Sequence, residues 1–114
     1  MDEVIKINIE KLKETRNENK ANYEDRIRKE AIKVANNIIK QVCNDFASYT
    51  EKQNYTTVKV RIDKDEDSIK HAGRINGIEW ANHEFYKVGW NMESNGTYVD
   101  SEGTYVFLTV YFEE

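Results

Sequence analysis

Apolar residues recur with two different periods along this chain, and the period changes near residue 54. Between residues 22 and 49 they are spaced three and four apart, which places them on one stripe of a helix. That stripe consists of Ile27, Ala31, Val34, Ile38, Val42, Phe46 and Tyr49. After residue 54 apolar and polar residues alternate, as in strands. The pattern therefore predicts a long amphipathic helix followed by a sheet.

The predicted helix has a recognisable start. Asn22 is suited to cap it, and Glu24 and Asp25 then fall in the first turn, where acids favour the helix dipole. Its end is predicted near residues 50–54. Before it, residues 5–12 fit the spacing of either a strand or a helix, and residues 13–25 have almost nothing to bury. We expect residues 1–21 to form a polar arm, or a short helix followed by a break.

Three segments of the second half alternate like strands: residues 56–63, 84–92 and 104–112. Residues 74–80 add a candidate for a shorter fourth strand. Asn95-Gly96 and the stretch from Asp100 to Gly103 are turn signals, which favour an antiparallel meander. We therefore predict a single α+β domain over residues 1–114, with the long helix packed on a three- or four-stranded antiparallel sheet.

Alternation also gives this sheet two different faces. The predicted core face, against which the helix should pack, carries Val58, Val60, Ile62, Tyr86, Val88, Trp90, Met92, Val106, Leu108, Val110 and Phe112. The opposite face carries Lys59, Arg61, Phe85, Lys87, Asn91, Tyr105, Phe107, Thr109 and Tyr111. A solvent-facing side is normally more polar than this. We expect it to be covered by residues 4–12, by an identical subunit or by another partner.

The candidate partner-binding residues are the aromatic and basic members of this second face. They are Phe85, Tyr105, Phe107, Tyr111, Lys59, Arg61 and Lys87. Such a mixture suits a protein interface or a stacking surface for single-stranded nucleic acid. Nucleic acid is the less favoured partner, because the formal net charge is −4 and residues 55–114 hold six Lys and Arg against eleven Asp and Glu.

No catalytic or metal-binding motif is evident. Asp63, Asp65 and Asp67 resemble the start of a calcium loop, but its sixth and twelfth positions hold Ser and Arg where Gly and Glu are required. His71 and His83 lack metal-ligand spacing. Cys43 lies close to the helix stripe, so we expect a small core residue rather than a nucleophile. We predict no catalytic residue, metal or cofactor.

Localisation and function follow from these observations as hypotheses. The charged N-terminus does not read as an export signal, and no apolar run approaches 20 residues, which indicates a cytoplasmic protein without a membrane segment. We expect a non-enzymatic protein-binding module. By analogy of class alone, it suits a small acidic phage or mobile-element inhibitor of a host nucleic-acid-handling complex, as anti-CRISPR proteins are. One alternative is a structural subunit of a homo-oligomer, such as a homodimer, or of a phage particle. A second is a small-ligand binder or enzyme with a site around His71, His83, Glu79 and Glu84.

Overall fold

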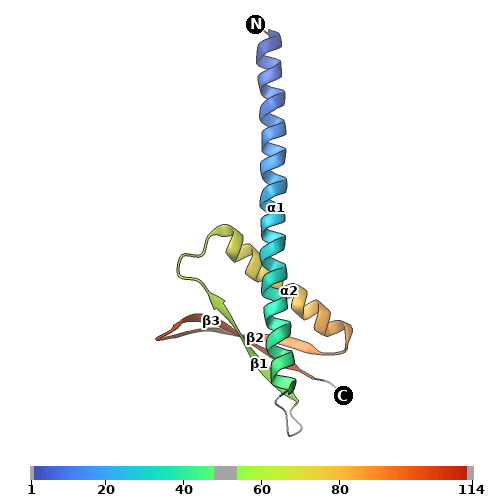
Figure 1. Ribbon diagram of the computed structural model, residues 1–114, viewed down its shortest axis with the longest axis vertical. Coiled ribbons are helices and arrows are strands. Elements are labelled where there is room, and N and C mark those ends of the chain that lie inside the picture. Colours follow the sequence, from blue (N-terminus) through green and yellow to red (C-terminus); the bar gives the residue numbers. More distant parts are fainter. Residues whose placement is uncertain (1, 48–53, 113–114) are drawn as a thin grey trace.

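The computed structural model describes the backbone of residues 2–47 and 54–112, and the side chains of residues 9–45 and 54–112. Its elements follow in the order α1 (Asp2–Ala47), β1 (Tyr55–Ile62), α2 (Ser68–Lys87), β2 (Asn91–Asp100) and β3 (Gly103–Tyr111). A long N-terminal helix and an antiparallel sheet are thus both present (Figure 1). The predicted α+β class is confirmed.

Helix α1 runs unbroken for 46 residues, so the predicted start at Asn22 and the break before it are wrong. Residues 13–25 contain neither Gly nor Pro, and their many Lys, Glu and Arg residues are good helix formers. Asp25 is an interior residue of the helix, where its carboxylate accepts from Lys29 at 3.1 Å and from Arg28 at 2.9 Å. Hydrogen bonds from Lys29 and then Arg28 lower the pKa of this carboxyl. The predicted helix end beyond residue 47 lies outside the described residues.

Helix α2 occupies residues for which strands were predicted, namely 74–80 and the first four residues of 84–92. Its buried positions are Gly73, Gly77, Ala81 and Phe85, which recur every four residues. Because glycine has no side chain, this stripe is not visible in a hydrophobic pattern, whereas the alternation from Tyr86 to Met92 is. The helix begins after Asp67, whose carboxylate accepts from the Lys70 backbone N–H at 2.8 Å.

The two helices cross at close range, and the crossing lies in the lower half of α1 in the view of Figure 1. A Cβ built on Gly77 would lie 2.7 Å from the Ala31 carbonyl oxygen and 2.7 Å from Val34 Cβ. One built on Gly73 would lie 2.5 Å from Glu30 Cβ. Only glycine permits this separation of the two backbones.

Beyond the crossing, the N-terminal half of α1 extends away from the sheet, and its side chains from Ile9 to Glu24 are exposed.

The sheet has the strand order β1-β3-β2, with both neighbouring pairs antiparallel. This differs from the predicted meander, in which the second strand would be central. The turn predicted at Asp100 to Gly103 does connect β2 to β3. Asn95-Gly96 is not a turn: it lies within β2, where the register to β3 shifts between Ser94 and Thr97 and Gly96 adopts a φ of +93°. A β-bulge of this kind uses glycine's access to positive φ.

Both helices pack on one side of the sheet, where the core lies. Its buried residues come from α1 (Ala35, Ile38, Val42), β1 (Val58, Val60), α2 (Ala81, Phe85) and β3 (Leu108, Val110). The sequence placed four of these on the core face, and Trp90, Met92, Val106 and Phe112 pack partly buried against them. Tyr86 and Val88 were wrongly predicted to be core and are exposed, because they lie at the end of α2 instead of in a strand.

Candidate functional site

The side of the sheet that faces away from both helices, called here the outer sheet face, is the candidate site. Its residues follow from the register, since Val58, Val60, Leu108 and Val110 point into the core and their neighbours must point away. Within the described part of the chain, α1 contacts α2 and β1, while α2 contacts α1 and β2; none of these contacts covers the outer side. The described residues therefore leave this face open.

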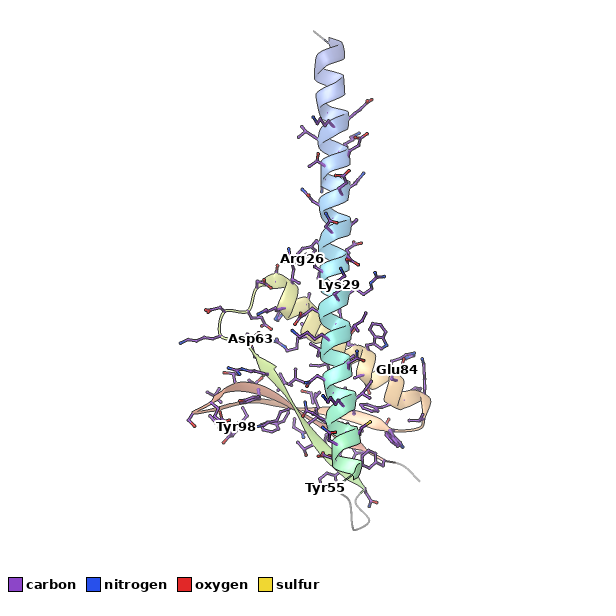
Figure 2. All side chains as sticks on the ribbon, viewed as in Figure 1. Arg26, Lys29, Tyr55, Asp63, Glu84 and Tyr98 are labelled. Atoms are coloured by element: carbon purple, nitrogen blue, oxygen red, sulfur yellow. The ribbon has the colours of Figure 1, made fainter. Side chains whose placement is uncertain are left out.

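Three rungs of paired residues cross this face. Arg61, Tyr105 and Tyr98 form one rung, Thr57, Thr109 and Glu93 another, and Tyr55, Tyr111 and Asn91 a third. Lys59 and Phe107 pair between the first two, beside the bulge of β2. Four of the five aromatic residues on the face are tyrosines. Figure 2 shows Tyr55 and Tyr98, which belong to the two outermost of these rungs.

The aromatic side chains contact one another across the strands. Tyr98 and Phe107 meet edge to face with ring centroids 5.5 Å apart, and the centroids of Tyr55 and Tyr111 are 6.3 Å apart. Lys59 Nζ lies 4.5 Å from the centroid of the Tyr105 ring, within range of a cation–π interaction. The central strand thus bears a band of rings held in place by residues of both edge strands.

Much of this aromatic surface is in contact with solvent. Tyr55 is 55% exposed, Tyr98 53% and Tyr111 39%, while Tyr105 and Phe107 are half-buried by their neighbours. Thr109, in the same row, is buried, and its hydroxyl accepts a hydrogen bond from the Asn95 amide. An aromatic surface of this size on one face is typical of an interaction site rather than of ordinary solvent-facing sheet.

Five of the seven predicted partner-binding residues come together on this face: Lys59, Arg61, Tyr105, Phe107 and Tyr111. Phe85 and Lys87 do not, because they belong to α2. The Phe85 side chain is in the core, stacked on Trp90 at 6.0 Å between centroids, and Lys87 Nζ bonds Glu84 at 3.0 Å. Residues 9–12 do not cover the face either, since Ile9 and Leu12 are exposed on the projecting part of α1.

Sequence reasoning missed two aromatic members of the face, Tyr55 and Tyr98. Tyr55 lies one residue before the predicted first strand. Tyr98 lies between the turn signals at Asn95-Gly96 and at Asp100 to Gly103, in a segment to which no strand was assigned. The available signal for an additional strand there was the high strand propensity of Thr97, Tyr98 and Val99.

Charge is divided between the two edge strands of the outer sheet face. Strand β1 carries Lys59 and Arg61, and β2 carries Glu93 and Asp100, while the central strand is uncharged. The Asp100 carboxylate accepts from the backbone N–H groups of Glu102 at 2.8 Å and Gly103 at 3.0 Å, so it also stabilises the β2–β3 turn. Within the strands themselves, one border of the aromatic band is basic and the other is acidic, and just beyond β1 the Asp63 carboxylate lies 4.0 Å from Arg61 Nε.

The free edge of β1 is partly occupied by a side chain from α1. The Gln41 amide donates to the Lys59 carbonyl at 2.8 Å and accepts from the Lys59 N–H at 3.1 Å. These are the two hydrogen bonds that another strand would make at this residue. Gln41 therefore hinders pairing with a further strand along this edge. The candidate interaction surface is the face of the sheet rather than its edge.

The two histidines do not come together in a common site. His71 lies at the start of α2, where its Nδ1 is 3.5 Å from Glu66, and Glu66 also binds the largely buried Arg74. His83 is twelve residues further along the same helix, a rise of about 18 Å. Asp63 binds Lys70 at 3.0 Å, and this hydrogen bond lowers the pKa of the Asp63 carboxyl. Glu79 and Glu84 lie on α2 away from His71, and Glu84 binds Lys87.

The remaining candidates do not point to a ligand. Among residues 9–45 and 54–112, no three His, Cys, Asp or Glu side chains gather as metal ligands would. Cys43 is exposed, contrary to the predicted core position. A depression of about 640 Å³ between the end of β1 and the β2–β3 turn is lined by Arg61, Ile62, Asp63, Lys64, Val99, Asp100, Ser101, Glu102, Gly103 and Thr104. Its lining mixes both signs of charge, so it selects neither anions nor cations.

Comparisons with known proteins add no further assignment. No protein-family model, no curated protein and no solved structure matches the chain. No helix in the described part of the chain combines the length and apolar character needed to cross a membrane.

Proposed function

We propose that this chain is a non-enzymatic protein-binding module that acts through the outer sheet face. The observation that carries the proposal is the band formed by Tyr55, Tyr98, Tyr105, Phe107 and Tyr111, which no described element covers. Tyrosine supplies a large contact area with few rotatable bonds and a hydroxyl for the polar rim, which is why it is enriched at protein interfaces.

A protein fits this surface better than a nucleic acid does. Stacking of bases on the aromatic rings would bring phosphates past the borders of the face, where Glu93 and Asp100 oppose the attraction of Lys59 and Arg61. The formal net charge of −4 adds a general repulsion. A protein partner can present both signs of charge and match the two borders separately.

We include in this proposal the narrower hypothesis that the chain is a phage-encoded inhibitor. It rests on composition and small size, not on any residue of the outer sheet face. It directs the search for partners towards nucleic-acid-handling protein complexes.

Site-specific photocrosslinking in cells tests the proposal directly. Tyr98 is replaced by the photoreactive residue p-benzoylphenylalanine, which retains a large aromatic side chain at a half-exposed position of the face. The matched control carries the same residue in place of Tyr86, which is 71% exposed on α2. We expect a covalent protein adduct from position 98 and not from position 86.

Two results would count against a binding role of the face. One is the absence of any protein adduct from position 98 in cells that express the chain at its natural level. The other is an identical set of adducts from positions 98 and 86, which would indicate random collisions. Mass spectrometry of the adduct identifies the partner, whether it is another protein or a second copy.

A further inference from the structure

We propose that the partner bound by the outer sheet face is a second copy of this chain, related by a two-fold axis that runs parallel to the strands. This inference rests on the proposed function, because it assigns an occupant to the same surface. It is carried by the division of charge between the borders of the face, with Lys59 and Arg61 on β1 and Glu93 on β2.

The order of the strands makes this face complementary to itself. Strand β3 is central, so a two-fold axis parallel to the strands places β3 of one copy over β3 of the other. The same rotation places the basic strand β1 over the acidic strand β2 of the second copy, and the reverse on the other side. Each copy then contributes the same surface, as a two-fold dimer requires.

The alternative two-fold axis, which runs across the strands, gives the opposite result. It would place β1 over β1, so that Lys59 and Arg61 of one copy would approach the same two cations of the other. It would also place the acidic strand β2 over β2 of the second copy. Like charges facing each other across an interface are destabilising, so charge selects the axis parallel to the strands.

The rungs of the sheet show which groups would meet. A rotation about an axis parallel to the strands keeps each residue at its level along the strand. Arg61 and Tyr98 share a level, so the Arg61 guanidinium of one copy lies over the Tyr98 ring of the other. Lys59 and Glu93 differ by one rung spacing of two residues, about 7 Å along the strand, which a lysine side chain can span.

The area of the face sets the expected strength of this dimer. Three strands about 4.8 Å apart and about eight residues long give a flat area of roughly 400 Å² per copy. Two copies together then bury roughly 800 Å² before the protruding tyrosines are counted, which is below the 1,200–2,000 Å² typical of specific interfaces. We therefore expect a weak dimer, with an affinity in the micromolar range or weaker.

Charge exchange at Lys59 and Glu93 tests this arrangement in purified protein. Each of Lys59→Glu and Glu93→Lys places like charges together twice in the dimer, so we expect at least about tenfold weaker association for either variant. The double variant Lys59→Glu/Glu93→Lys restores both pairs and should recover most of the affinity. An equimolar mixture of the two single variants should associate more tightly than either variant alone.

Sedimentation velocity across a micromolar-to-millimolar concentration series measures these affinities. The matched control is Lys40→Glu on α1, which gives the same net charge as Lys59→Glu but lies on the helix side of the fold. It should dimerise like the wild type. Circular dichroism confirms the fold of each variant, and the mixture supplies a readout that a folding defect in one variant would not restore.

A wild-type chain that stays monomeric throughout the series would overturn the inference. So would a dimer whose affinity in both single variants is the same as in the wild type. If the chain is monomeric and position 98 crosslinks to a different protein in cells, the second-copy inference is wrong and the proposed binding role stands. If position 98 gives no adduct while the purified chain is monomeric, both are wrong.

Discussion

The helix crossing at Gly77 offers a quantitative test of the fold. Alanine at position 77 adds one methyl group, whose carbon would lie 2.7 Å from the Ala31 carbonyl oxygen and 2.9 Å from Val34 Cγ1. The first of these atoms belongs to the backbone of α1, so it cannot move aside by a change of rotamer. Helices α1 and α2 must separate to admit the methyl group, and this disturbs the core residues that lie between them and the sheet.

Two effects of opposite sign determine the size of the change. Replacing glycine by alanine inside a helix favours the helix by about 1 kcal/mol. Overpacking a tight site costs about 1–3 kcal/mol, and the backbone contact places Gly77 near the upper limit. We therefore expect Gly77→Ala to lower the free energy of unfolding by about 2 kcal/mol, which corresponds to a melting temperature roughly 8 °C lower for a domain of this size.

Chemical denaturation in urea, followed by circular dichroism, measures the change. Asn76→Ala is the matched control, because Asn76 is the neighbouring residue of α2 and is exposed. It gains helix propensity without a steric conflict and should raise the free energy of unfolding by about 0.5 kcal/mol. If Gly77→Ala is as stable as the wild type or more stable, the close crossing of α1 and α2 is wrong.

Two further predictions concern single contacts. Gln41→Ala removes both hydrogen bonds to Lys59 and should lower the free energy of unfolding by about 1 kcal/mol and speed amide hydrogen exchange at Lys59; unchanged exchange there would refute the edge contact. The Asp63 pKa, lowered by the hydrogen bond from Lys70, should lie below the usual value of about 3.9 in an NMR titration. A carboxyl with a lowered pKa stabilises the fold at neutral pH, and this contribution is lost as pH falls through its folded pKa. Lys70→Met should return the Asp63 pKa to its usual range, and an unshifted Asp63 pKa in the wild type would contradict this ion pair.

Where the period of the sequence was unambiguous, the expected elements are present. Ala31, Ala35, Ile38 and Val42 lie buried on one side of α1, and alternation correctly placed Val58 and Leu108 towards the core. The same alternation placed Tyr105, Phe107 and Tyr111 together on the opposite face with Lys59 and Arg61. Their role in binding stays a prediction.

The errors at α2 and within β2 share one cause, which is that glycine contributes nothing to a hydrophobic pattern. Gly73 and Gly77 are two of the four buried positions of α2, yet in a hydrophobic pattern they look like interruptions. Gly96 likewise suggested a turn, although in β2 it permits a bulge.

The sequence by itself determined which surfaces are apolar, because side-chain chemistry and local period are properties of neighbouring residues. It thereby determined a long helix, an antiparallel sheet and an aromatic second face. Only the tertiary structure decided that β3 is central, that α2 packs through glycines and that the outer sheet face has one basic and one acidic border. Those features depend on contacts between residues far apart in the chain, where backbone separation and strand order set which side chains become neighbours.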